Sequence, residues 1–162
     1  MTFRRAASVD VPVLRLLAER IWREVYPPII GETQVEYMLA RMYAAETIAR
    51  ELADGVAWEI ALLDEREVGF LALSVEVGSR AKLHKLYLLP EYHGRGHGQA
   101  LITRACAVAR EQGALELWLQ VNKRNVRAIR AYQRAGFRCE REAVFDIGDG
   151  FVMDDFLMIL AI

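Results

Sequence analysis

The sequence has few of the residues that build metal sites or disulfide frameworks. Among 162 residues there are two cysteines, Cys106 and Cys139, and three histidines, His84, His93 and His97. No HExxH motif and no pair of CxxC motifs occurs. We therefore predict no metal site and no disulfide scaffold. Both thiols are expected to be buried, and Cys106, in the middle of a predicted helix, is not expected to act as a nucleophile.

The chain also lacks an excess of charge of either sign and lacks long hydrophobic runs. Lys and Arg total 21 and Asp and Glu total 22, a formal net charge of −1. This balance argues against a general nucleic-acid binder, whose surface is strongly basic. Apolar stretches such as 156–162 are shorter than the roughly 18 residues of a membrane helix, and residues 1–7 contain no hydrophobic signal core. We therefore predict a cytoplasmic protein with no nucleic-acid or membrane partner.

The spacing of apolar residues predicts a mixed fold of class α/β (α+β). With 54% apolar and 27% charged residues, the composition fits one globular domain over residues 1–162. Helical spacing is found from about residue 10 to the Pro27-Pro28 pair and over 35–42, 46–53, 96–112 and 124–135. Strand patterns are found over 2–6, 58–63, 68–77, 82–89, 115–121, 137–146 and 151–160. This order combines hairpins with one strand–helix–strand crossover, so the sheet should be mixed.

A glycine-rich segment, His93-Gly94-Arg95-Gly96-His97-Gly98, separates the strand at 82–89 from the helix at 96–112. Glycines let the backbone approach another molecule closely, and the first N–H groups of a helix favour an anion. The segment therefore predicts a phosphate cradle, although glycine-rich turns also serve tight packing. Gln99 stands where a GxGxxG motif needs its third glycine, and no GK[ST] follows, so nucleotide cofactors are disfavoured. The ligand is expected where the strands at 82–89 and 115–121 separate.

Two segments resemble GCN5-related N-acetyltransferases, the GNAT family. LYLLPEYHGRGHGQALI is similar to the acetyl-CoA motif R/Q-x-x-G-x-G/A, with His93 where Gln or Arg is usual. VNKRNVRAIRAYQRAGF is similar to V-N-x-x-N-x-x-A-x-x-x-Y-x-x-x-G-F, and the seven matching positions are Val121, Asn122, Asn125, Ala128, Tyr132, Gly136 and Phe137. The resemblance implies a mixed, mostly antiparallel sheet of about seven strands flanked by four to five helices. It also implies acetyl-CoA as the cosubstrate.

The resemblance implies roles for individual residues. The loop from His93 to Gly98 would hold the pyrophosphate by its N–H groups, with Arg95 adding a charged contact. Leu86 and Leu88 would present main-chain groups to the pantetheine and the acetyl carbonyl. The predicted binding residues are therefore Leu86, Leu88, His93, Gly94, Arg95, Gly96, His97, Gly98, Asn125 and Tyr132. Asn125 and Tyr132, two helical turns apart, would face one ligand, and Tyr132 would protonate the departing CoA sulfur.

The general base is less clearly marked. An alkyl ammonium with a pKa near about 10.4 keeps its proton at neutral pH, so a group must remove it. His84 precedes Leu86 by two residues, and in a regular strand both would face the same side. His84 is therefore the candidate base, and the alternative is a partly exposed strand histidine.

Asp154 and Asp155 are adjacent on the last predicted strand, so one carboxylate should point inward and need a partner. That partner is either a structural arginine or a cationic substrate. The segment GDGFVMDDFLM is similar to the tail of PaiA-type polyamine acetyltransferases, a branch of the family.

The sequence thus predicts an acetyl-CoA-dependent N-acetyltransferase that acts on a primary amine of a small cationic molecule, such as a polyamine, by direct attack in a ternary complex. The alternatives are a protein N-terminal or lysine acetyltransferase, which needs an open groove, and a non-catalytic acyl-CoA binding module. Helices within residues 14–53 are expected to roof a small pocket. The apolar final strand suggests a homodimer.

Overall fold

A computed structural model describes residues 1–76 and 78–162. One sheet has seven strands in the order β1-β2-β3-β4-β5-β7-β6, and only β4 and β5 pair in parallel. The strands are β1 Thr2–Arg5, β2 Ala57–Leu63, β3 Arg66–Glu76, β4 Arg80–Leu88, β5 Glu116–Asn122, β6 Arg138–Gly148 and β7 Phe151–Ala161. The predicted mixed, mostly antiparallel sheet of seven strands is confirmed. Val77, the predicted end of the third strand, lies outside the described residues.

The described residues form six helices, where four to five were expected. They are α1 Val11–Val25, α2 Pro27–Ile30, α3 Glu32–Met42, α4 Ala45–Ala53, α5 His97–Glu111 and α6 Val126–Arg134. The additional helix is α2, a single turn that begins at Pro27. Proline suits the first position of a helix, where its missing N–H is not needed. The Pro27-Pro28 pair therefore ends α1 as predicted and also starts a new turn.

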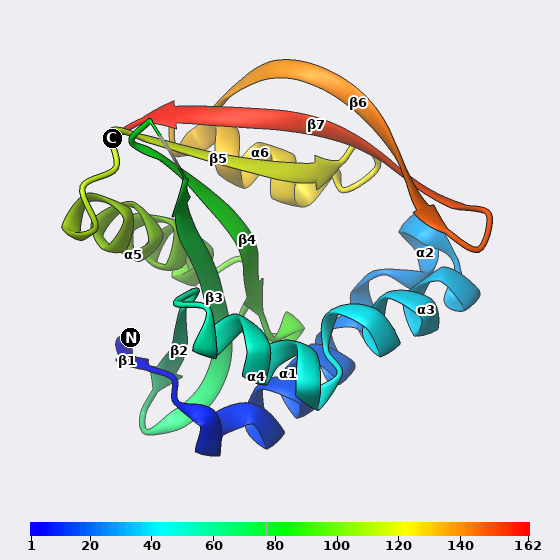
Figure 1. The fold of residues 1–162 in the computed structure, drawn as a ribbon, viewed down its shortest axis with the longest axis horizontal. Coiled ribbons are helices and arrows are strands. Elements are labelled where there is room, and N and C mark those ends of the chain that lie inside the picture. Colours follow the sequence, from blue (N-terminus) through cyan, green and yellow to red (C-terminus); the bar gives the residue numbers. More distant parts are fainter. Residues whose placement is uncertain (77) are drawn as a thin grey trace.

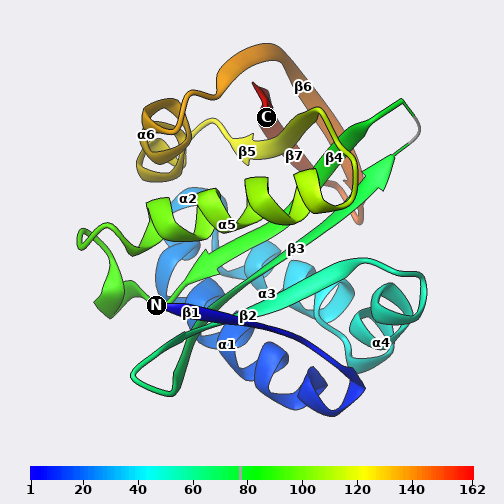
Figure 2. The ribbon, with the colours of Figure 1, turned by 90° about the vertical axis from the view of Figure 1, so that its left-hand side faces the viewer.

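The sheet is covered on both faces. Helices α1–α4 pack on one face and α5 and α6 on the other (Figures 1 and 2). Two buried clusters result: one contains Leu71, Leu73, Leu101, Leu117 and Met158, and the other contains Leu14, Ile21, Trp58, Ile60 and Phe70. Neighbouring residues of β3, Phe70 and Leu71, belong to different clusters because successive strand side chains point to opposite faces.

Strands β4 and β5 separate partway along their length. Their pairing is confined to Arg80–Leu83 of β4 and Glu116–Leu119 of β5, after which the two strands diverge (Figure 1). The main chain of β4 from Lys85 to Leu88 therefore pairs with β3 alone. This separation lies at the ends of the two strands where the sequence predicts the ligand.

A β-bulge interrupts the alternation of β4. Ala72 of β3 pairs with Lys85, but the next residue, Leu73, pairs with Leu83, so His84 is an extra residue. A bulge shifts all following side chains to the other face. The expectation that His84 and Leu86 share a face is therefore wrong: His84 contacts Ser74, and Leu86 packs against the cluster beneath α5.

The hairpin of β6 and β7 reaches across to α3. Its tip is held there by Gln34, whose Nε2 donates to the Val152 carbonyl at 2.9 Å, and by Tyr37 and Arg41, which donate to the Ile147 carbonyl. β7 lies inside the sheet, paired on both sides. The final strand therefore offers no free edge to a second subunit. The homodimer stays a prediction, but the apolar final strand no longer supports it.

The two cysteines differ in exposure. Cys106 is buried in α5 and Cys139 is exposed on β6, an edge strand, so the expectation of two buried thiols is wrong for Cys139. Burial raises the pKa of the Cys106 thiol. Among the helices of residues 1–76 and 78–162, none is long and apolar enough to cross a membrane.

Candidate active site

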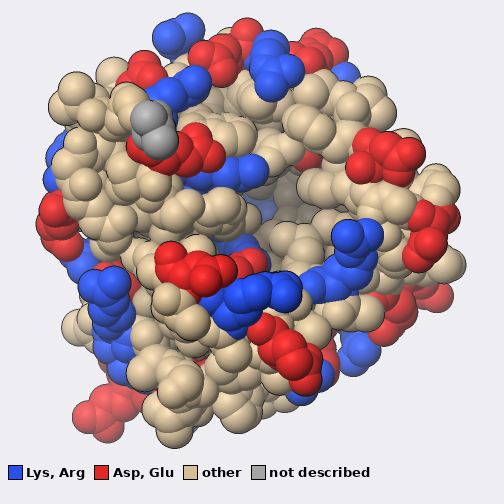
Figure 3. All heavy atoms as spheres, viewed as in Figure 1, with Lys and Arg blue, Asp and Glu red and all other residues tan. Residues whose placement is uncertain are grey.

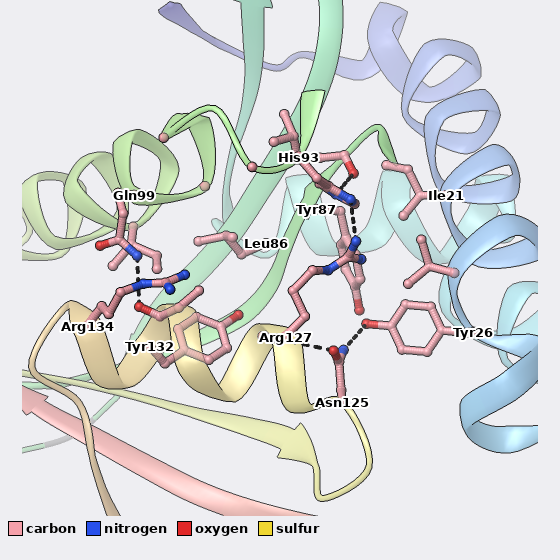
Figure 4. A pocket seen from close by; sticks show the side chains of 18 residues that line it. Ile21, Tyr26, Leu86, Tyr87, His93, Gln99, Asn125, Arg127, Tyr132 and Arg134 are labelled. Carbon is pink, nitrogen blue, oxygen red and sulfur yellow. Dashed lines mark hydrogen bonds between the residues drawn. The ribbon is translucent and has the colours of Figure 1, made fainter. Parts of the chain in front are cut away.

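Two cavities meet where β4 and β5 separate. The first, of about 420 Å³, lies between the glycine-rich loop, β4, α5 and α6 (Figure 4) and is called the loop cavity. The second, of about 400 Å³, lies beneath α1–α3 and the hairpin of β6 and β7 and is called the roof cavity. Six residues line both cavities, and we call them the shared wall: Tyr26, Leu86, Tyr87, Asn125, Ala128 and Tyr132.

The glycine-rich loop forms an open backbone cradle. Gly94 and Gly96 have φ angles of +75° and +82°, which strain any other residue. Gly96 caps α5 without a side chain, and a Cβ added at Gly94, Gly96 or Gly98 would meet nothing within 4 Å. All three glycines and His93 line the loop cavity, whereas Arg95 and His97 do not. The N-terminus of α5 thus presents its backbone to an anion-sized space.

His93 connects the loop to α6. Its Nε2 lies 2.9 Å from the Leu88 carbonyl and its Nδ1 lies 2.6 Å from Nη1 of Arg127. A carbonyl oxygen only accepts, so Nε2 carries the proton and Nδ1 accepts from the guanidinium. Burial and the charge of Arg127 lower the pKa of His93. A neutral His93 therefore holds the Arg127 cation beside the loop cavity.

Asn125 and Tyr132 lie two turns apart at α6 and both line the shared wall, as their spacing predicts. Asn125 is the N-cap: its Oδ1 accepts from the Ala128 N–H at 3.2 Å, and its Nδ2 donates to the Tyr26 hydroxyl at 3.5 Å. Tyr132 projects from α6 toward Leu86 (Figure 4). Burial raises the pKa of Tyr132 well above its ordinary value, so its hydroxyl stays protonated and able to donate.

His84 lines the roof cavity, and Leu86, which also lines that cavity, packs on the opposite face of β4. Its Nε2 is 2.8 Å from the Ser74 Oγ. Burial, Lys85 and Lys82 lower the pKa of His84 to about 4. The imidazole is therefore neutral near pH 7, but it is a weak base beside an alkyl amine. Its role as general base stays a prediction.

The N-terminal helices cover the roof cavity, as expected, and they line it with aromatic and methionine side chains. Trp22 and Tyr26 stack with ring centroids 4.3 Å apart, and the Tyr87 ring lies 5.9 Å from Trp22. Met38 and Met42 of α3 add flexible apolar side chains. Of these residues, only Tyr87 lies in one of the two motif segments.

Two lysines of β4 supply positive charge to the roof cavity. Lys85 is 4% exposed, and its Nζ lies 2.8 and 2.7 Å from the two carboxylate oxygens of Glu51. Nζ of Lys82 lies 4.6 Å from the centroid of the Trp118 ring. Figure 3 shows blue Lys and Arg side chains beside a hollow in this face of the molecule. Glu51 neutralises Lys85, since both of its oxygens are bound to that ammonium.

Asp154 and Asp155 have opposite environments, as the alternation of β7 predicts. Asp154 is exposed and lies 2.6 Å from Nζ of Lys123. Asp155 is 0% exposed, and neither oxygen has a hydrogen-bond partner among the described residues. Burial, and then Asp154, raise the pKa of Asp155 to about 6. No arginine meets this carboxylate within 1–76 and 78–162, so the first of the two predicted partners is not found.

The family model of the acetyltransferase (GNAT) family matches residues 18–137, which include the glycine-rich loop, the strands β4 and β5, and α6. The chain belongs to the GNAT family. This match agrees with the two motifs, because the glycine-rich loop and the segment around Tyr132 both lie inside the matched range.

Relatives and solved structures extend the GNAT match over most of the chain. An uncharacterised N-acetyltransferase of Mycobacterium tuberculosis (strain H37Rv) is 34% identical over 140 residues, which are 86% of this chain and 90% of that protein. The spermidine N(1)-acetyltransferase of Thermoplasma acidophilum is 26% identical over 156 residues, 93% and 94% of the two chains. The crystal structure of the PaiA N-acetyltransferase from Thermoplasma acidophilum in complex with coenzyme A matches with a TM-score of 0.84 at 25% identity, covering 99% and 98%.

The loop cavity of this GNAT member contains two arginines that sequence reasoning missed. Arg127 and Arg134 line it from α6, seven residues apart and therefore on one helical face. Each arginine lies two positions after a predicted site residue, about 200° round the helix, so the predicted face of Asn125 and Tyr132 did not include them. Gln99, whose Nε2 donates to the Ala131 carbonyl at 2.8 Å, joins α5 to the same helix.

Proposed function

We propose that this GNAT protein transfers the acetyl group of acetyl-CoA to a primary amine of a small molecule. The single observation that carries this proposal is the shared wall: two cavities of suitable size meet at Tyr132, which lines both. A donor in the loop cavity and an acceptor in the roof cavity would have their reacting groups side by side there. Holding two reactants in this way is a large part of catalysis.

The loop cavity fits acetyl-CoA by its backbone and its charge. The open space over Gly94, Gly96 and Gly98 accepts a diphosphate at the N-terminus of α5. Arg127 and Arg134 supply positive charge beside it. The PaiA structure with coenzyme A supports the same ligand, and the ligand supplies the thioester that the amine attacks.

The reaction forms a bond between the amine nitrogen and the acetyl carbon and breaks the carbon–sulfur bond. Tyr132 would donate its hydroxyl proton to the departing sulfur, a role supported by its protonated hydroxyl and by its position in the lining of both cavities. The acceptor nitrogen loses two protons, one before attack and one as the amide forms; one of them restores the hydroxyl of Tyr132 and the other goes to water. His84 is the candidate proton acceptor in the roof cavity. Because its pKa is about 4, it would hold the proton only briefly and pass it on to water.

The roof cavity favours a small acceptor over a polypeptide. Helices α1–α3 cover it, and the hairpin tip is bonded to Gln34 and Tyr37 of α3, which closes the side where an open groove would run. The name of the spermidine relative supports a polyamine. We therefore extend the proposal to a cationic amine of polyamine size.

A thiol-release assay with acetyl-CoA tests the proposal on a panel of spermidine, n-butylamine, amino acids, aminoglycosides and short peptides. We expect transfer to a small amine and none to peptides. Tyr132→Phe should lower kcat about 10² to 10⁴-fold while the Kd for acetyl-CoA, measured by calorimetry, changes less than twofold. If the wild type binds acetyl-CoA but acetylates nothing, the non-catalytic binding module is favoured instead. An unchanged kcat in Tyr132→Phe would remove Tyr132 from the reaction.

A further inference from the structure

The carboxylate of Asp155 is a buried charged group near this site that the proposed reaction does not use. Its oxygens are fully buried without a hydrogen-bond partner among the described residues. A buried charge without a partner is costly, so proteins retain it only where another interaction offsets the cost. Glu51, the carboxylate that lines the roof cavity, is already bound to Lys85. Of the two partners predicted for this carboxylate, an arginine is not found among the described residues, which leaves a cationic substrate.

The sheet register places Asp155 behind the wall of the roof cavity. Residues paired across an antiparallel ladder share a face, and so do residues two apart on one strand. Asp155 pairs with Asn122 of β5 and is two residues from Met153 of β7, which pairs with Phe145 of β6. Asn122, Met153 and Phe145 all line the roof cavity. The carboxylate therefore lies on the cavity side of the sheet, immediately behind these residues.

The charge of Asp155 reaches the shared wall. Burial is the main cause that raises the pKa of Tyr26; the positive charge of Arg127 lowers that pKa, and the negative charge of Asp155 raises it by a smaller amount. Tyr26 lines both cavities. Because the surroundings are dry, a charge there is weakly screened and acts over several ångströms. The field of the carboxylate is thus present at the place where donor and acceptor would meet.

The neighbouring charges do not cancel it. Lys123 lowers the pKa of Asp155, but its ammonium lies 2.6 Å from Asp154 and 2.7 Å from Glu142 on the outer face. Asp154 raises the pKa of Asp155, and its own charge is paired with Lys123. These contacts leave the charge of Asp155 unpaired among the described residues, whereas the positive charges of Lys82 and Arg127 line the roof cavity and the loop cavity.

We propose that Asp155 is a positioning residue whose negative charge holds the ammonium group of the acceptor at the shared wall. It acts across the wall through its field and not by contact, since its side chain is fully buried. This inference rests on the proposed function and adds to it how a cationic acceptor is recognised. It also accounts for a buried carboxylate that has no partner among the described residues, because the positive charge of the bound acceptor would offset the cost of burying it.

Asp155→Asn tests the inference, because it removes the charge and keeps the shape. With the best amine of the panel, and with n-butylamine as a single-charge probe, we expect KM to rise at least tenfold. We expect kcat to change less than threefold and the Kd for acetyl-CoA less than twofold. The matched control is Asp154→Asn, which alters the exposed neighbour and should leave KM within twofold.

Unfolding temperatures separate this role from a structural one. The folded-state pKa of Asp155, about 6, exceeds the ordinary value of 3.8 for an aspartate. Folding therefore favours the neutral carboxyl, and stability is lost as the pH rises from about 4 through about 6. Without substrate, Asp155→Asn should match the wild type at pH 4 and unfold at a higher temperature at pH 8.

The outcomes are distinguishable. A raised KM together with a higher unfolding temperature at pH 8 supports the inference, since a residue that merely held the fold together would lose both activity and stability. An unchanged KM overturns the inference and leaves the proposed function standing. Loss of stability or of acetyl-CoA binding also overturns it. If the wild type acetylates no amine at all, the proposed function fails and this inference fails with it.

Discussion

The loop cavity and the roof cavity are alike in size but differ in how the sequence builds them. Most of the loop cavity comes from residues 86–134, a continuous stretch with two motifs. The roof cavity takes side chains from Trp22 to Met153, spread over α1, α3, β4, β5 and the last hairpin. A contiguous site is recognisable from the order of residues. A dispersed site is formed by the fold, and it can change without altering a motif.

Gly98→Val would break the loop cavity alone and has the largest expected effect in this comparison. The φ of Gly98 is outside the left-handed region, unlike that of Gly94 and Gly96, so a side chain causes no backbone strain. It would fill the space of the diphosphate and remove one or two charge-assisted hydrogen bonds, so acetyl-CoA affinity should fall about 100-fold. Calorimetry measures the affinity. An unfolding temperature close to that of the wild type is the control, and normal affinity would contradict the cradle.

Glu51→Gln would disturb the roof cavity alone, and we expect it to lower stability and not acetyl-CoA affinity. It leaves the Lys85 ammonium, 3% exposed in its side chain, with a neutral partner. Breaking a buried pair from one side is strongly destabilising, and the partial exposure of Glu51 reduces the cost to about 2–3 kcal/mol. Urea unfolding measures this loss. Affinity for acetyl-CoA in the folded protein should stay within twofold, and a parallel loss of that affinity would show that the two cavities are not independent.

A smaller effect is expected at His93, where the two motif segments touch. His93→Leu removes the acceptor of the Arg127 guanidinium, about 1 kcal/mol of hydrogen bonding, and should raise the KM for acetyl-CoA about fivefold. His93→Gln, which keeps an acceptor, should stay within twofold. Steady-state kinetics at fixed amine concentration distinguish the two variants. Equal effects of Leu and Gln would mean that His93 does not hold Arg127.

The elements that could be predicted from the sequence are those in which apolar residues recur at a regular spacing or a glycine indicates a turn or a helix end. Alternation gave β5, and glycines marked the turn of the last hairpin and the start of α5. α2 was missed, because Pro27-Pro28 is a helix stop for α1 and a helix start for the next turn. The bulge at His84 was missed because no glycine or proline marks it, and the face of His84 was therefore wrong.

The candidate site was predictable to the extent that its residues lie in motifs. Gly94, Gly96, Asn125 and Tyr132 were singled out and line the loop cavity. Tyr26 and the methionines of α3 were not, since nothing in the local sequence separates a cavity-lining aromatic from a core one. For Asp154 and Asp155 the alternation predicted that one is buried, but only the register against Asn122 decides which.

The extra residue in β4 sets how much length variation this strand tolerates. Lys82 pairs with Ser74 and Lys85 with Ala72, so the two lysines share a face although they are three residues apart. Deleting His84 would restore strict alternation and would leave both lysines on the same face, because they would then be two residues apart. Homologues or designed variants that lose only this residue can therefore keep both lysines, whereas a strand that keeps its length and loses the bulge would turn one ammonium toward the apolar layer beneath α5.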